Sequence, residues 1–187
     1  MILAGDETVA TRCLSKFSRL LRMVLIHSDK EKITLREELE TLQLYIELES
    51  FRFKDRFEYT VTCDEAIDKD ETKIPTMLIQ PFIENAIWHG LMHKEGLRKL
   101  HVHFIEEEND WLVCIIEDNG IGRQASQAIK EYSAHENKHT GKGIAVASDR
   151  LKIFSEYSGN GCGLQITDMK DEQGNAAGTR VVVKFPA

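Results

Sequence analysis

The sequence predicts an α+β fold: a two-layer sandwich in which helices lie on one face of a mixed β-sheet, preceded by a helical hairpin. Three observations support this. Strand-like segments of alternating apolar residues follow one another without intervening helices, which excludes a doubly wound parallel sheet. Residues 75–92 form a segment so apolar that it must pack against a sheet. Two long helical patterns precede every strand.

The two N-terminal helices predict a hairpin. From Asp6 to Ile26, apolar residues occupy more than one helical stripe, so this helix needs a partner. The segment from His27 breaks the pattern. Thr34 and Glu37 then have the spacing of a capping box, and apolar residues at helical intervals continue to about Arg52. The pattern fits an ordinary packed helix pair and a dimer interface equally well.

The remaining elements follow from periodicity and turn residues. Residues 123–140 are polar and nearly without periodicity, which suggests a mobile segment longer than an ordinary connection. The other predicted elements are, in order, a strand at 57–63, a helix at 75–92, a β-hairpin with strands at 100–105 and 111–118, a helix at 144–154, and strands at 164–168 and 179–185.

Composition excludes several classes of protein. The 187 residues include 24 Lys and Arg against 31 Asp and Glu, a net charge of −7, which argues against direct nucleic-acid binding. The four cysteines form no Cys-x-x-Cys, so neither a zinc site nor a disulfide framework is indicated, and a reducing, cytoplasmic compartment fits best. Because no signal peptide and no apolar run of about 20 residues occurs, we expect this chain to make no membrane contact.

Three polar residues on the helix at 75–92 are candidate functional groups. Asn85 and His89 are four residues apart and therefore share a helix face, and Glu84 lies one step round from them. An Asn beside a carboxylate and an imidazole is either a hydrogen-bonded core amide or an oxygen ligand for a hard cation such as Mg²⁺. The helix alone does not decide between the two.

Glycine-rich segments provide further candidates. Asp118 ends a strand and is followed by Gly120, Ile121 and Gly122, so a carboxylate and closely approaching backbone could meet a ligand with an exocyclic amine such as adenine. Gly141, Lys142 and Gly143 precede a helix, where backbone N–H groups can bind phosphates. Gly178 and Thr179 begin the last strand. Each pattern alone is weak, because such turns are common.

The order and spacing of these four patterns resemble the N, G1, G2 and terminal boxes of the ATPase superfamily of gyrase, histidine kinases and MutL, which has the Bergerat fold. Within that superfamily, four segments closely resemble the LytS/YehU-like sensor histidine kinases, and the resemblance covers nearly the whole chain. These segments are Leu35-Arg-Glu-Glu-Leu-Glu40, Tyr45-Ile-Glu-Leu-Glu49, Arg52-Phe-Lys-Asp-Arg56 and Ile74 to Gly90.

The resemblance implies a site for ATP and Mg²⁺. Asn85 would coordinate Mg²⁺ between the phosphates, and Asp118 would bind the adenine amine, with Glu84 an orienting group. The rest of the implied set comprises Gly120, Ile121 and Gly122 admitting the base, residues 123–140 as the ATP lid, Gly141, Lys142 and Gly143 closing on the phosphates, Thr179 under the adenine end, and His89 at a matching motif position.

The resemblance also implies partners and context. Residues 1–54 would be a remnant of the dimerisation and phosphoacceptor helices, which would form a homodimer, and residues 55–187 would be the ATP-binding catalytic domain. The protein would be the cytoplasmic portion of a bacterial membrane sensor. It would use ATP to phosphorylate a histidine and pass the phosphoryl group to an Asp of a response regulator, often of the LytTR type.

The sequence departs from the family at two places. None of the seven histidines precedes a proline, so the family's phosphoacceptor motif is missing. We therefore expect the sequence to begin inside the dimerisation helices, just after that site, and to be unable to phosphorylate itself on the family's histidine. The usual Asn after the second glycine box is Val146, which removes one polar contact of the lid and leaves the glycines.

Two other functions remain as alternatives. An ATP hydrolase of the same fold would release phosphate without a second protein. A degenerate module would associate through the helical hairpin and bind no nucleotide, which the intact Asn85, Asp118 and glycines argue against. Phosphate release by this chain alone would favour the hydrolase, and failure to bind any nucleotide would favour the degenerate module.

Overall fold

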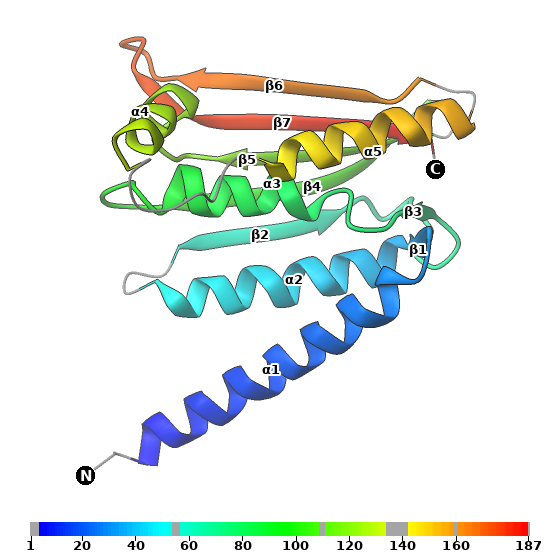
Figure 1. The fold of residues 1–187 in the computed structure, drawn as a ribbon, viewed down its shortest axis with the longest axis horizontal. Coiled ribbons are helices and arrows are strands. Elements are labelled where there is room, and N and C mark those ends of the chain that lie inside the picture. The colour runs from blue at the N-terminus through cyan, green and yellow to red at the C-terminus, as the bar shows by residue number, and fades with distance from the viewer. Residues whose placement is uncertain (1–3, 54–56, 109–110, 134–141, 159–160, 187) are drawn as a thin grey trace.

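The computed structural model describes residues 4–53, 57–108, 111–133, 142–158 and 161–186. It confirms the mixed sheet with helices on one face (Figure 1). The five strands lie in the order β2-β4-β5-β7-β6, with β2 parallel to β4 and the other neighbouring strands antiparallel. The strands are β2 (Glu58–Cys63), β4 (Lys99–Glu107), β5 (Trp111–Asp118), β6 (Gly163–Lys170) and β7 (Ala176–Pro186).

The helices provide the second layer and the hairpin. They are α1 (Ala4–Ser28), α2 (Leu35–Arg52), α3 (Gln80–Asn85), the π-helix η1 (Ala86–Leu91), α4 (Arg123–Ser133) and α5 (Lys142–Ser158). Helix α3 contacts α5, η1 packs on β5, and α2 contacts β2. Figure 1 shows α1 running along α2 near its C-terminal end and diverging from the rest of the molecule toward the N-terminus.

One hydrophobic core joins α2, α3, η1 and the sheet. Leu35, Leu42 and Ile46 from α2 are buried in the same cluster as Phe104 and Phe185 from the strands. The alternation of buried and exposed residues along β4 gives the sheet one apolar face, and burial of that face drives the helices onto it. The division into domains at residue 54 stays a prediction.

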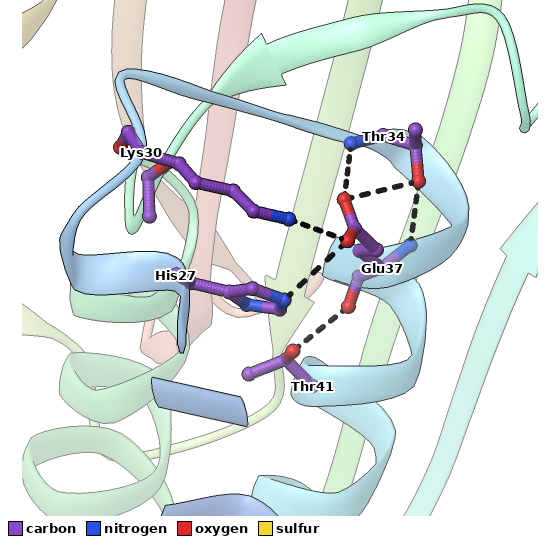
Figure 2. Close-up of polar contacts among 6 residues, drawn as sticks. His27, Lys30, Thr34, Glu37 and Thr41 are labelled. Atoms are coloured by element: carbon purple, nitrogen blue, oxygen red, sulfur yellow. Dashed lines mark hydrogen bonds and ion pairs between the residues drawn. The ribbon is translucent and has the colours of Figure 1, made fainter. Parts of the chain in front are cut away.

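The turn between α1 and α2 is held by the predicted capping box (Figure 2). The backbone N–H of Thr34 donates to Oε2 of Glu37 at 2.9 Å, and the Thr34 hydroxyl accepts from the Glu37 backbone N–H at 3.2 Å. Lys30 donates to Oε1 of the same carboxylate at 2.9 Å, and the Nε2 atom of His27 lies 3.9 Å from it. Burial lowers the pKa of His27, and Glu37 opposes that shift.

The helix predicted at 75–92 begins at Gln80 instead, and its second half is a π-helix rather than an α-helix. Pro75 instead ends a short strand, β3 (Lys73–Pro75), which pairs antiparallel with β1 (Lys32–Thr34). Met77 follows with a φ of 56°, which no helix accommodates, and Pro81 marks the true helix start. From Ala86 onward the helix is π, with the Met92 N–H donating to the carbonyl of Ile87, five residues back, at 2.9 Å.

The polar segment at 123–140 was predicted to lack regular structure, and this is wrong for its first part. Residues 123–133 form helix α4, which buries Ser126 and leaves the neighbouring residues exposed. Its polar composition hid the helix, although Ala125, Ala128 and Ile129 recur at helical spacing and give it an amphipathic pattern. Helix α5 begins at Lys142, two residues earlier than expected, and the rest of the predicted lid lies outside the described residues.

Candidate functional site

A cavity of about 400 Å³ opens between the α3–η1 helix, α4 and the sheet. Five of the predicted site residues line it, and they come from three separate segments of the chain. These residues are Asn85, His89, Asp118, Gly122 and Thr179. Apolar side chains complete the wall, namely Phe82, Ile116, Ile166 and Val181. An apolar cavity with a few converging polar groups is typical of a small-ligand site.

Asp118 is the most buried polar group of the cavity, with 4% of its surface exposed. Its Oδ1 atom accepts from the Gly120 N–H at 2.8 Å, and the Thr179 backbone N–H also donates to the carboxylate. Burial raises the pKa of Asp118 to about 6, against the effect of these hydrogen bonds and of the Lys94 charge. The group is therefore mainly an acceptor at pH 7, ready for a donor such as an amine.

Three glycines allow this arrangement because neighbouring backbone and side-chain atoms occupy the space of a Cβ. A Cβ on Gly90 would lie 2.6 Å from Oδ1 of Asp118, and one on Gly120 would lie 2.3 Å from the Gly90 carbonyl carbon. Gly178, with a φ of +130°, lies against the backbone of Asp118. Gly90, Gly120 and Gly178 thus pack the loop after β5 against the end of η1 and the start of β7.

The residues on either side of Gly120, Asn119 and Ile121, make different contacts. Asn119 faces β4, where its side chain accepts from the Lys99 N–H at 2.8 Å and donates to the Leu97 carbonyl at 3.0 Å. The Ile121 N–H donates to the Gly90 carbonyl at 3.2 Å. Gly120 and Ile121 therefore hold the loop against η1, while Gly122 lines the cavity.

Asn85 has its side chain oriented by its own helix. The Nδ2 group donates to the Pro81 carbonyl at 2.6 Å, so the amide oxygen is the atom turned to other partners. Pro81 removes an N–H from the first turn, and its carbonyl four residues before Asn85 serves as the anchor. An amide oxygen on a cavity wall is a suitable ligand for a hard cation.

Glu84 and His89 lie differently relative to the cavity. His89 lines it. Glu84 lies on the α2 side of α3, where it accepts from Gln80 Nε2 at 2.9 Å. Burial, and next the charge of Glu84, raise the pKa of Tyr45 on α2. Glu84 and His89, which are five residues apart in the sequence motif, thus point to different surroundings.

The second glycine box is described in part. Lys142 and Gly143 form the first turn of α5, and Gly141 lies outside the described residues. The implied lid contributes Ser126 and Gln127 of α4 to the cavity wall.

Sequence reasoning placed Arg123 in the implied lid and missed its contact with Asp168. Arg123 lines the cavity and makes two hydrogen bonds to Asp168 of β6, at 2.7 and 2.8 Å, which fix the start of α4 against the sheet edge. No motif marks a salt bridge between residues 45 positions apart. Ile116 and Val181 could have been found, because each lies two residues along a strand from a predicted site residue and therefore faces the same side.

Known proteins resemble the chain in sequence. A family model described as histidine kinase matches residues 1–57. The chain is 27% identical over 156 residues to the sensor protein LytS of Oceanobacillus iheyensis, covering 82% of this chain and 26% of that protein. It is 29% identical over 184 residues to the sensor histidine kinase YesM of Bacillus subtilis, covering 98% and 29%. The chain thus spans about a quarter of the length of these relatives.

Solved structures resemble it in fold. The histidine kinase domain of the blue-light activated histidine kinase from Erythrobacter litoralis EL346 superposes with a TM-score of 0.58 at 16% identity, covering 93% of this chain and 74% of that one. The catalytic domain of histidine kinase ThkA superposes with a TM-score of 0.51 at 12% identity, covering 83% and 94%. At such identities the agreement concerns the fold.

Proposed function

The chain is a relative of the LytS-like sensor histidine kinases, and from this we propose that its cavity binds ATP with Mg²⁺ for transfer of the γ-phosphoryl group to a histidine outside this sequence. The observation that carries the proposal is the cavity itself, which brings Asn85, Asp118 and Thr179 together from three elements. Its volume of about 400 Å³ lies within the range of small-ligand sites.

The adenine end of the nucleotide lies at Asp118. Its buried carboxylate would accept a hydrogen bond from the exocyclic amine of adenine. The apolar side chains of Ile116 and Val181, which line the same cavity, would contact the adenine ring. The Gly120 and Thr179 N–H groups hold the carboxylate in place, so its orientation does not depend on the ligand. Asp118 therefore provides preorganised recognition of adenine.

The phosphate end lies toward Asn85 and the start of α5. The amide oxygen of Asn85 fits an Mg²⁺ ion that keeps several waters and is bound mainly through phosphates, because such an ion needs only one or two protein oxygens. Lys142 and Gly143, in the first turn of α5, are the groups that we assign to the phosphates together with Gly141. When bound, ATP supplies the phosphoryl group and Mg²⁺ neutralises its charge.

The chain's own contribution is orientation. Asn85 fixes the metal end and Asp118 fixes the base, so the γ-phosphate has a defined direction. Glu84 is hydrogen-bonded to Gln80 and turned toward α2. We assign to it the orientation of the imidazole of the histidine that receives the phosphoryl group. Residues 123–140, including helix α4, act as the lid that excludes water.

Helix α1 supports a homodimer. Leu14, Phe17, Leu21 and Leu25 are spaced three or four residues apart and therefore share one helix face. Their exposed fractions are 66%, 50%, 47% and 69%. An apolar stripe of this length is typical of an interface, and a second copy of α1 would cover it. The family resemblance further supports a response regulator as partner, for which we propose the LytTR type.

None of the helices in the described ranges is long and apolar enough to cross a membrane. We propose that the chain is the cytoplasmic portion of a longer membrane sensor.

Calorimetric titration with a non-hydrolysable ATP analogue tests the nucleotide site, with and without Mg²⁺. We expect saturable binding that is weakened at least tenfold in Asp118→Asn, because an amide can turn a donor toward the adenine amine. Asn85→Ala should retain Mg²⁺-free binding and lose the Mg²⁺-dependent gain. Absence of binding by the folded chain would overturn the proposal, and phosphate release by the chain alone would favour a hydrolase.

A further inference from the structure

A buried carboxyl links the hairpin to the helix that carries Asn85. Glu38 lies in the first turn of α2 with 2% of its surface exposed. The backbone N–H of Ile79, the residue that immediately precedes α3, donates to this carboxyl. Its Oε1 atom is buried and has no hydrogen-bond partner among the residues that the structure describes.

The first turn of α3 holds the anchors of both polar side chains that follow. Ile79 donates to Glu38, Gln80 donates to Glu84 at 2.9 Å, and the Pro81 carbonyl accepts from Asn85 at 2.6 Å. Ile79, Gln80 and Pro81 are consecutive. A shift of this turn would therefore move Glu84 and Asn85 together.

The segment before this turn is held by contacts from other elements. Met77 has a φ of 56°, a strained conformation for a residue with a side chain. Around it, the Thr76 N–H donates to the Glu31 carbonyl at 3.1 Å, and Arg150 of α5 donates to the Thr76 carbonyl at 2.9 Å. The strained backbone thus depends on the α1–α2 turn, α5 and Glu38.

We propose that Glu38 is a positioning residue, which fixes the first turn of α3 against α2 and so sets the place of Asn85 relative to the helical hairpin. The inference rests on the proposed function, since it assigns to Glu38 an effect on the metal end of the nucleotide site. A movement of α2 would therefore be passed to Asn85 through the hydrogen bond between Glu38 and the Ile79 N–H and through the first turn of α3.

Packing alone does not explain a carboxyl at this position. An unpartnered buried oxygen is destabilising, and an apolar side chain of similar volume would fill the space with less cost. Burial raises the pKa of Glu38 to about 8, so the group is mostly neutral at pH 7 and needs no counter-charge. Burial, and next the charge of Glu38, raise the pKa of the Cys114 thiol of β5 well above its usual range.

Three variants separate positioning from packing. Glu38→Met keeps an unbranched side chain of similar length and removes the acceptor. Glu38→Gln keeps the acceptor. Glu40→Met is the matched control, because Glu40 lies on the same helix and its carboxylate pairs with Arg19 of α1. Each variant is titrated with the ATP analogue with and without Mg²⁺, after circular dichroism has shown it to be folded.

We expect Glu38→Met to lose about tenfold of the Mg²⁺-dependent gain in affinity, while Mg²⁺-free binding, which depends on Asp118 of β5, stays within about twofold. Glu38→Gln and Glu40→Met should match the unchanged chain. An equal loss with and without Mg²⁺, or no loss, would overturn the inference. Should Glu38→Met fail to fold, Glu38→Asp, which shortens the side chain by one methylene, must show the same selective loss.

Amide hydrogen exchange of the ligand-free chain gives a second measurement that needs no nucleotide. Exchange at Ile79 to Asn85 should accelerate at least tenfold in Glu38→Met and remain unchanged in Glu40→Met. If the unchanged chain binds no analogue while this difference is seen, the proposed function fails and the positioning role stands. Unchanged exchange would overturn that role.

Discussion

Gly90 lies so close to Asp118 that a Cβ at Gly90 would be 2.6 Å from the Oδ1 atom of that carboxylate. The helix end and the strand end therefore meet without an intervening side chain, and the buried carboxylate faces the cavity. The same contact continues through Gly120, whose own Cβ would strike the Gly90 backbone at 2.3 Å. The floor of the cavity is thus formed largely by backbone atoms of the loop after β5 and the end of η1.

Gly120→Ala should be one of the most damaging small substitutions in the chain. The atoms that block its Cβ belong to backbone, so the loop after β5 must move away from η1. We expect a loss of about 2 kcal/mol or more in the free energy of unfolding, measured with urea, and loss of analogue binding. Gly161→Ala is the control, since nothing lies within 4 Å of its Cβ position, and it should change neither quantity.

Analogue binding should depend on pH through Asp118. Its pKa is raised to about 6 by burial, and only the ionised form is a pure acceptor for an amine. Affinity should therefore fall about tenfold between pH 7 and pH 5, as titration calorimetry can measure. In Asp118→Asn the residual affinity should be flat over this range, and an equally steep profile in that variant would assign the titration to another group.

Stability should fall with rising pH because of Glu38. Its pKa in the folded protein is about 8, against 4.5 as the ordinary value, so the folded state holds a proton that the unfolded state releases between these values. The stabilisation is complete below about pH 4.5 and is lost as pH rises toward 8, at roughly 1.4 kcal/mol per pH unit for a fully buried group. Urea unfolding of Glu38→Gln should show a correspondingly shallower decline, whereas Glu40→Gln should follow the unchanged chain.

The apolar stripe of α1 predicts self-association. Replacing Phe17 by Glu places a charge in the middle of the stripe and should shift a dimer to monomer in sedimentation equilibrium. Ser18→Glu adds the same charge at an exposed neighbouring position and should leave the dimer intact. A chain that is monomeric without any substitution would contradict the interface.

The capping box of α2 predicts a modest, local effect. Thr34→Ala removes the acceptor for the Glu37 N–H and should cost about 1 kcal/mol of stability, while Thr34→Ser should cost much less. Thermal unfolding of the two variants checks this. Equal loss in both would mean that the methyl group, rather than the hydroxyl, stabilises the turn.

Local patterns sufficed where a residue's role depends on its near neighbours. Thr34 and Glu37 marked the start of α2, and alternation marked the strand that ends at Asp118. The sequence also predicted that Asn85, His89 and Thr179 belong to one site, because their order matched a known set of motifs. These residues line one cavity, and their role as a nucleotide site stays a prediction.

What escaped prediction depends on contacts between distant segments. Pro75 looked like a helix start and is a strand end, because it pairs with Lys32, more than 40 residues earlier. Arg123 gave no signal without Asp168. Helix α4 was missed because its apolar positions, Ala125, Ala128 and Ile129, are few in a polar segment, and the π winding after Asn85 leaves no mark in an apolar sequence.

The alignment of three strands at the cavity limits where the chain could have gained or lost residues. Thr179 of β7 lies opposite Asp118 of β5 and opposite Asp168 of β6, which holds Arg123. Inserting one residue between Thr179 and Phe185 would turn one part of the strand over and separate the cavity from the core. The turn at Gly174 and Asn175, beyond the register shift at Met169, is where length variation among related proteins should be tolerated.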